Sequence, residues 1–165
     1  HCNEEVAREI EQYYPGWPFE IRILRSFEPT QLGDICLTPI SAYHKLDEDS
    51  LNFLFEYSGN SLLYATDTGF YREPTWEFLK GRQIQALVLE CTEGLHRTEY
   101  HGHLDLKEFL AMVERLKETG AITQDAIIAT THHSHFGDLT HAELEERLAP
   151  HGVLVGYDGM VLDIP

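Results

Sequence analysis

Side chains that can bind metal or transfer protons stand directly after four strand-like runs of the sequence. Asp67 follows the run 62–66, and Glu90 ends the run that contains Leu87-Val88-Leu89. His132 follows 127–131, and His44 follows 37–43. In α/β sheets the carboxyl ends of the strands form the edge where sites are built, because rigid strands deliver side chains there. One such residue is usually structural, but four in one chain predict a functional site.

Histidine is abundant, with 10 in 165 residues, and most of these lie between His96 and His151. They cluster in His101-Gly102-His103 and in the segment 132–135. Neutral imidazole binds Zn, Mn or Fe, and an aspartate carboxylate can bridge two ions. The residue types at the predicted strand ends therefore favour a site for divalent metal ions, although several of these histidines are equally compatible with solvated loops.

The elements that must position these residues follow from hydrophobic periodicity. The pattern predicts helices over 3–13, 75–81, 105–119 and 140–148, and strands over 19–26, 35–43, 52–57, 61–66, 84–91, 126–131, 153–157 and 160–164. Segment 105–119 has the clearest apolar stripe, with Asp105 as its cap. The chain is therefore predicted to be α/β, with an antiparallel beginning followed by alternating helices and strands. No linker is visible, so residues 1–165 form a single predicted domain.

Composition narrows the class of partner. With 12 Lys+Arg against 28 Asp+Glu, the formal charge is −16, which argues against nucleic acid and anionic lipid as partners. No apolar run is long enough to span a membrane. The 3 cysteines are widely spaced and odd in number, so a disulfide framework is not expected and a reducing cytoplasm is the predicted location.

An ordered set of motifs carries a family resemblance. These are Tyr43-His44, Leu63-Tyr64-Ala65-Thr66-Asp67-Thr68-Gly69, Leu87-Val88-Leu89-Glu90-Cys91-Thr92, Gly102-His103-Leu104-Asp105-Leu106, Thr131-His132-His133-Ser134-His135 and Gly156-Tyr157-Asp158-Gly159-Met160. The chain resembles the metallo-β-lactamase-fold hydrolases, and most of all the branch that includes the phosphodiesterase of the phosphonate-degradation pathway. Each motif is loose by itself, but together they cover residues 35–164 in the right order.

The resemblance implies an αββα sandwich with two divalent metal ions (Zn, Mn or Fe) at one edge. It implies that His44 binds the first metal, that Asp67 bridges both and that His132 binds the second. His103 would contact the substrate phosphate, and Asp158 would orient a ligand histidine from the outer shell. Glu90 is assigned the same orienting role, with a buried or turn-capping carboxylate as the alternative.

One departure from the family pattern affects the metal site. The family's most diagnostic element, H-x-H-x-D-H, should lie just before a helix, but it is absent as a whole because the sequence contains no H-x-H-x-D. Because His1 directly precedes the predicted helix 3–13, we interpret it as the last histidine of that motif and as a ligand to the second metal. The fold is then expected to be incomplete on its N-terminal side. The alternative is that His1 is not part of the native motif.

The predicted function is metal-dependent hydrolysis, with a hydroxide held between two metals attacking a small phosphodiester. The acidic charge makes tRNA an unlikely substrate and favours a small molecule. Two alternatives stay open: hydrolysis of a lactam, lactone or thioester by the same fold, and a degenerate fold that serves as a non-catalytic binding module. A homodimer is compatible with each of these three functions.

Overall fold

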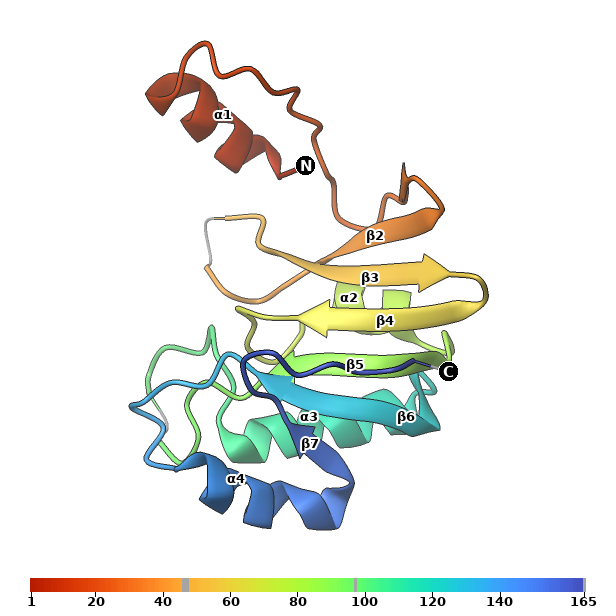
Figure 1. The fold of residues 1–165 in the computed structure, drawn as a ribbon, viewed down its shortest axis with the longest axis vertical. Coiled ribbons are helices and arrows are strands. Elements are labelled where there is room, and N and C mark those ends of the chain that lie inside the picture. The colour runs from red at the N-terminus through yellow and green to blue at the C-terminus, as the bar shows by residue number, and fades with distance from the viewer. Residues whose placement is uncertain (46–47, 97, 165) are drawn as a thin grey trace.

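The computed structural model describes residues 1–45, 48–96 and 98–164, and its centre is a seven-stranded sheet in the order β1 to β7 (Figure 1). The strands are β1 (Thr30–Leu32), β2 (Ile35–Ser41), β3 (Leu51–Tyr57), β4 (Asn60–Ala65), β5 (Ile84–Glu90), β6 (Ile122–Thr131) and β7 (Val153–Val155). The α-helices are α1 (Glu4–Tyr13), α2 (Glu73–Leu79), α3 (Leu106–Glu118) and α4 (His141–Leu148), and a short 3₁₀ turn, η1 (Ala149–His151), follows α4. The predicted α/β class is confirmed.

The sheet changes from antiparallel to parallel at β4. Strands β1 to β4 form an antiparallel meander, whereas β4 pairs with β5, β5 with β6 and β6 with β7 in parallel. Because β2 and β4 are both antiparallel to β3, β2 runs in the same direction as the parallel strands. The carboxyl ends of β2, β4, β5 and β6 consequently lie at one edge of the sheet.

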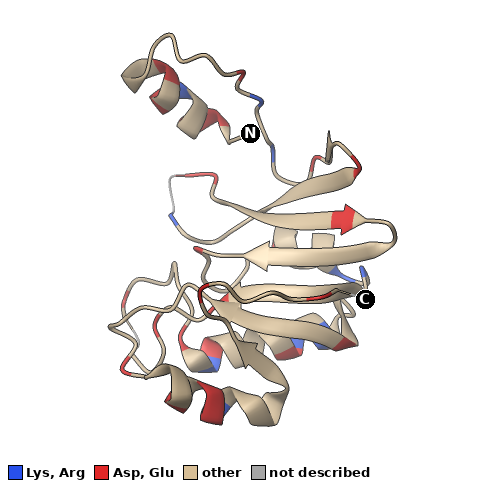
Figure 2. Cartoon of the chain, viewed as in Figure 1, with Lys and Arg blue, Asp and Glu red and all other residues tan. Residues whose placement is uncertain are grey.

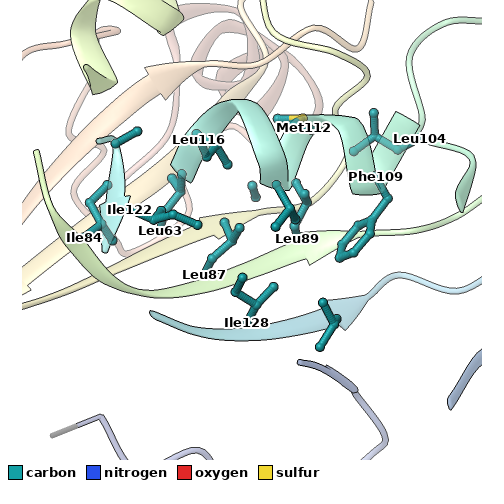
Figure 3. Close-up of a cluster of buried hydrophobic side chains, with 14 of the residues drawn as sticks. Leu63, Ile84, Leu87, Leu89, Leu104, Phe109, Met112, Leu116, Ile122 and Ile128 are labelled. Carbon is teal, nitrogen blue, oxygen red and sulfur yellow. The ribbon is translucent and has the colours of Figure 1, made fainter. Parts of the chain in front are cut away.

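The helices that follow β4 and β5 pack behind the sheet and close its core (Figure 1). Asp105 begins α3 with a capping box, since its side chain accepts from the Glu108 backbone N–H. The apolar stripe of α3 places Phe109 and Leu116 against the sheet, where Leu87 is also fully buried (Figure 3). This packing fixes the position of β5, whose last residue is Glu90.

The N-terminal helix stands apart from this core. Asn3 caps α1 by accepting from the Val6 N–H, and the helix projects beyond the β2 side of the sheet (Figure 1). The segment after α1 is rich in aromatics, and the Trp17 ring contacts the rings of Tyr14 and Phe19 edge-to-face. Acidic side chains are spread over α1, α3, α4 and the loops, while the strands carry almost no charge (Figure 2).

Two expectations about local structure were wrong, and one strand was missed. Residues 19–26 form no strand, and their β pairing is a single bridge between Cys2 and Ile23. Residues 160–164 are not a strand either, and β1 was not predicted. An apolar run becomes a strand only where a neighbouring strand pairs with its backbone, and periodicity alone does not report that neighbour.

Among the described residues, the seven-stranded sheet and the helices packed behind it correspond to one β layer and one α layer of an αββα sandwich (Figure 1). The segment after β7 passes in front of the other face of the sheet, where Met160 and Leu162 line a cavity together with Tyr64 and Val88. Within the described residues, none of the helices has the length and apolarity that a bilayer crossing requires.

Candidate metal centre

The residues predicted at strand ends converge at the carboxyl edge of the sheet. Asp67 lies two residues beyond β4, Glu90 is the last residue of β5, and His132 directly follows β6. His44 lies on the loop after β2, and His103 lies three residues before α3. The strand directions therefore bring these residues to one edge of the sheet, as the sequence predicts.

Asp67 lies between two histidines. Its Oδ1 atom is 3.5 Å from His132 Nε2 and 3.7 Å from His44 Nε2. The ring of His103 faces both imidazoles, with centroids 4.9 Å from His44 and 5.4 Å from His132. Three imidazoles thus surround one half-exposed carboxylate. This is a donor set that binds a divalent cation through nitrogen and oxygen.

The backbone at two of these positions is unusual. Asp67 has a φ of 50° and His132 a φ of 56°, both in the left-handed region that few non-glycine residues occupy. Such conformations persist only where the surrounding structure holds them, and they cluster at functional sites. Next to Asp67, the Thr68 N–H donates to Glu90 Oε1 at 2.6 Å, and the Gly69 N–H donates to the Tyr43 carbonyl at 2.7 Å.

The Glu90 side chain hydrogen-bonds to several groups of the candidate site. Its carboxylate is fully buried and accepts from the Thr68 N–H, the Leu104 N–H and the Thr92 hydroxyl, the last at 2.5 Å. Nδ1 of His103 lies 2.9 Å from Glu90 Oε1. This hydrogen bond raises the pKa of His103 above its ordinary value, although partial burial acts in the opposite direction.

Burial and the Glu90 charge also act on neighbouring groups. Burial, reinforced by Glu90, raises the pKa of the Cys91 thiol to about 12. The same causes, in the same order, raise the pKa of the Tyr71 hydroxyl. Both groups are therefore neutral at physiological pH.

Two groups of side chains have the spacing of metal ligands among the described residues. Ligand atoms of His44, Asp67 and His103 lie within 4.8 Å of one another, and so do those of Glu90, His103 and His132. The second group is already hydrogen-bonded, because both Glu90 oxygens accept from backbone and side-chain donors. The geometry of Glu90 therefore fits an orienting carboxylate, and the same contacts engage Nδ1 of His103. His44 and His132, whose Nε2 atoms lie 3.7 and 3.5 Å from Asp67 Oδ1, have the geometry of metal ligands together with Asp67.

Two predicted residues, His1 and Asp158, are not among the ligand-spaced side chains of the described residues. His1 is exposed ahead of α1 and belongs to neither metal-spaced group. Asp158 is exposed and lines a cavity of about 640 Å³ together with His132 and His133, but it makes no hydrogen bond to either within the described part of the chain. The roles assigned to His1 and Asp158 stay predictions.

Sequence reasoning missed two residues that hold the histidines. The Thr92 hydroxyl lies 2.8 Å from Nδ1 of His132. The Tyr100 hydroxyl donates to the His44 carbonyl at 2.8 Å, and the Tyr100 ring contacts the rings of His44 and His103 edge-on. Thr92 follows Glu90 in the motif that carried the resemblance, so its position was visible, whereas nothing in the sequence placed Tyr100 beside His44.

Comparison of the sequence with known families decides the classification. The profile described as "Beta-lactamase superfamily domain" matches residues 1–133. The chain belongs to this family. A comparison with curated protein sequences finds no significant match.

Solved structures of the same fold superpose well at low identity. A new diphosphatase from the PhnP family has a TM-score of 0.70 and 23% identity, over 96% of this chain and 55% of that one. An isothiocyanate hydrolase from Delia radicum gut bacteria has a TM-score of 0.70 and 20% identity, over 99% of this chain and 66% of that one. Zn²⁺-bound PqqB from Methylobacterium extorquens has a TM-score of 0.61 and 14% identity, over 86% and 55%. The chain thus spans a little over half to two thirds of their lengths, and they share its metallo-β-lactamase fold.

Proposed function

We propose that this chain carries the active site of a metal-dependent hydrolase that acts on a small phosphodiester. The observation that carries the proposal is the pairing of His103 with the buried Glu90 beside Asp67 and the other imidazoles. It joins a polarised proton donor to a set of metal ligands. The similarity in fold to the PhnP-family diphosphatase supports a substrate that is cleaved at phosphorus.

For the metals, we propose that His44 binds the first ion, that Asp67 bridges both and that His132 binds the second, together with His1. The nitrogen and oxygen donors suit Zn, Mn or Fe, and the zinc in the PqqB structure supports the first of these. When bound, such ions lower the pKa of water and neutralise charge on phosphoryl oxygens.

His103 is the proposed catalytic residue. Its Nδ1 atom is held by Glu90, which leaves Nε2 to contact a phosphoryl or leaving-group oxygen. Because Glu90 raises the pKa of His103, more of the protonated form is present near neutral pH, which suits donation of a proton. A charged donor at this position would also stabilise negative charge that develops on a phosphoryl group.

The substrate class follows from charge. A net charge of −16 opposes binding of a polynucleotide, which favours a small phosphodiester. Cys2, Cys36 and Cys91 are free thiols, which supports the proposed cytoplasmic location.

The second candidate function is hydrolysis at a carbon centre such as a lactam, lactone or thioester. It is favoured by the isothiocyanate hydrolase of the same fold.

The test is hydrolysis of bis(p-nitrophenyl) phosphate with added Mn²⁺ or Zn²⁺, run in parallel with a chromogenic lactam and a thioester. Asp67→Asn should abolish phosphodiester hydrolysis, and His103→Ala should slow it about 10²-fold or more, the range for loss of a general acid. His151→Ala, an exposed histidine on η1, is the matched control and should leave the rate unchanged. Unchanged rates in the Asp67 and His103 variants, or turnover of the carbon substrates alone, would refute the proposal.

A further inference from the structure

We infer that Thr92 is a positioning residue that fixes which nitrogen of His132 carries the proton, so that Nε2 of His132 is left as the free ligand atom. Thr92 lies two residues beyond β5 and is half-buried, and its Oγ1 atom lies at the centre of three short contacts. The inference rests on the proposed function only in taking His132 as a metal ligand.

The three contacts of the Thr92 hydroxyl determine its hydrogen bonding. Oγ1 lies 2.5 Å from Glu90 Oε2, 2.8 Å from the His132 carbonyl oxygen and 2.8 Å from His132 Nδ1. Glu90 as a carboxylate and the carbonyl can only accept, and a hydroxyl has one proton to give. That proton is used on these oxygens, so Nδ1 of His132 must be the donor and Oγ1 its acceptor.

The position of the second ring nitrogen agrees with this assignment. With the proton on Nδ1, the lone pair of neutral His132 is on Nε2, and Nε2 is the atom that faces Asp67 Oδ1 at 3.5 Å. A metal shared with Asp67 requires that lone pair. The opposite tautomer would place a proton where the ligand atom has to be.

Thr92 also connects the loops that meet at the site. Through Glu90 it joins the hydrogen bonds of Thr68 and His103, and its backbone carbonyl accepts from the Ser134 N–H at 3.3 Å. The Cys91 N–H donates to the Thr131 carbonyl, which continues the pairing of β5 with β6 as far as the site. One buried carboxylate therefore holds His103 directly and His132 through the Thr92 hydroxyl.

The test compares Thr92→Val, which keeps the shape but loses the hydroxyl, with Thr92→Ser, which keeps the hydroxyl. In the metal-free, ¹⁵N-histidine-labelled chain at alkaline pH, where ordinary imidazoles are neutral, ¹⁵N shifts report the tautomer of His132. Zn²⁺ affinity is measured in parallel by competition with a chelator. We expect the Nδ1–H form in wild type and Thr92→Ser, and a loss of that preference with a 10- to 100-fold weaker Zn²⁺ affinity, roughly, in Thr92→Val.

Several results would overturn the inference. A proton on Nε2 in the wild-type chain would do so without any variant, even if Thr92→Val failed to fold. Unchanged shifts in a folded Thr92→Val, or a Thr92→Ser that behaves like Thr92→Val, would do so as well. Because the tautomer is read without metal or substrate, a failure of the phosphodiesterase assay does not affect this outcome.

Discussion

Replacing Glu90 by glutamine tests whether hydrogen bonds to the buried Glu90 carboxylate hold the loops of the candidate site in place. Both Glu90 oxygens accept from one backbone N–H each, Oε1 from Thr68 and Oε2 from Leu104. Nδ1 of His103 lies within hydrogen-bond distance of both oxygens, and Oε2 also accepts from the Thr92 hydroxyl. Glutamine has a single acceptor oxygen. Whichever way its amide turns, its NH₂ group faces a buried backbone donor.

The expected loss of stability follows from these contacts. A buried donor left without a partner costs about 1–3 kcal/mol, and hydrogen bonds to charged groups contribute about 1.5–3 kcal/mol each. Removing one partner of a buried ion pair costs about 3–5 kcal/mol. This figure already includes the lost hydrogen bonds, so the costs are not added together. We therefore expect Glu90→Gln to lower the free energy of unfolding by about 3–5 kcal/mol near neutral pH.

The assay is urea unfolding followed by the fluorescence of Trp76, which is only 3% exposed and packs in the core beneath the site. Glu77→Gln, an exposed carboxylate on α2, is the matched control and should change the free energy by less than about 0.5 kcal/mol. A loss below about 1 kcal/mol in Glu90→Gln, equal to that of the control, would refute the argument that Glu90 holds the site.

The difference in free energy of unfolding between wild type and Glu90→Gln should also depend on pH. Since Glu90 raises the pKa of His103 above 6.5, the folded chain holds this proton more tightly than the unfolded chain. This stabilisation is fully present below pH 6.5 and is lost as the pH rises through the raised pKa. The stability difference between wild type and Glu90→Gln should therefore narrow at alkaline pH. A constant or widening difference would contradict the assignment.

Two further predictions concern packing around the site. Gly69→Ala should lower the free energy of unfolding by about 1–3 kcal/mol in the same assay, because an added Cβ would lie 1.8 Å from the His101 carbonyl oxygen. An unchanged free energy of unfolding would contradict the close approach of the loops that carry Gly69 and His101. In the native chain, iodoacetamide followed by mass spectrometry should modify Cys2 and Cys36 but spare Cys91, whose thiol is buried with a pKa of about 12, until denaturant is added. Modification of Cys91 at the rate of Cys36 would show that its surroundings open readily.

Local signals in the sequence were enough to establish the α/β class, most of the strands and helices, and the edge of the sheet at which the candidate residues lie. Apolar runs of strand length, an amphipathic stripe and a capping residue each act over a few neighbours, so they can be read without knowledge of distant contacts. Because β4, β5 and β6 are parallel, the residues that follow them have to meet at one edge. The strand pattern therefore sufficed to predict that Asp67 and His132 lie at the same edge of the sheet, and the structure places their side chains 3.5 Å apart.

The partners of each strand run and the surroundings of each imidazole depended instead on tertiary packing. Residues 19–26 have the composition of a strand but lack a paired neighbour beyond the bridge from Cys2 to Ile23. Glu90 could equally have been a turn cap, and its role depends on loops that are distant in sequence and supply His103 and Thr68 as donors. Hydrogen bonds between such loops depend on packing to within tenths of an ångström, and hydrophobic periodicity carries no information on that scale.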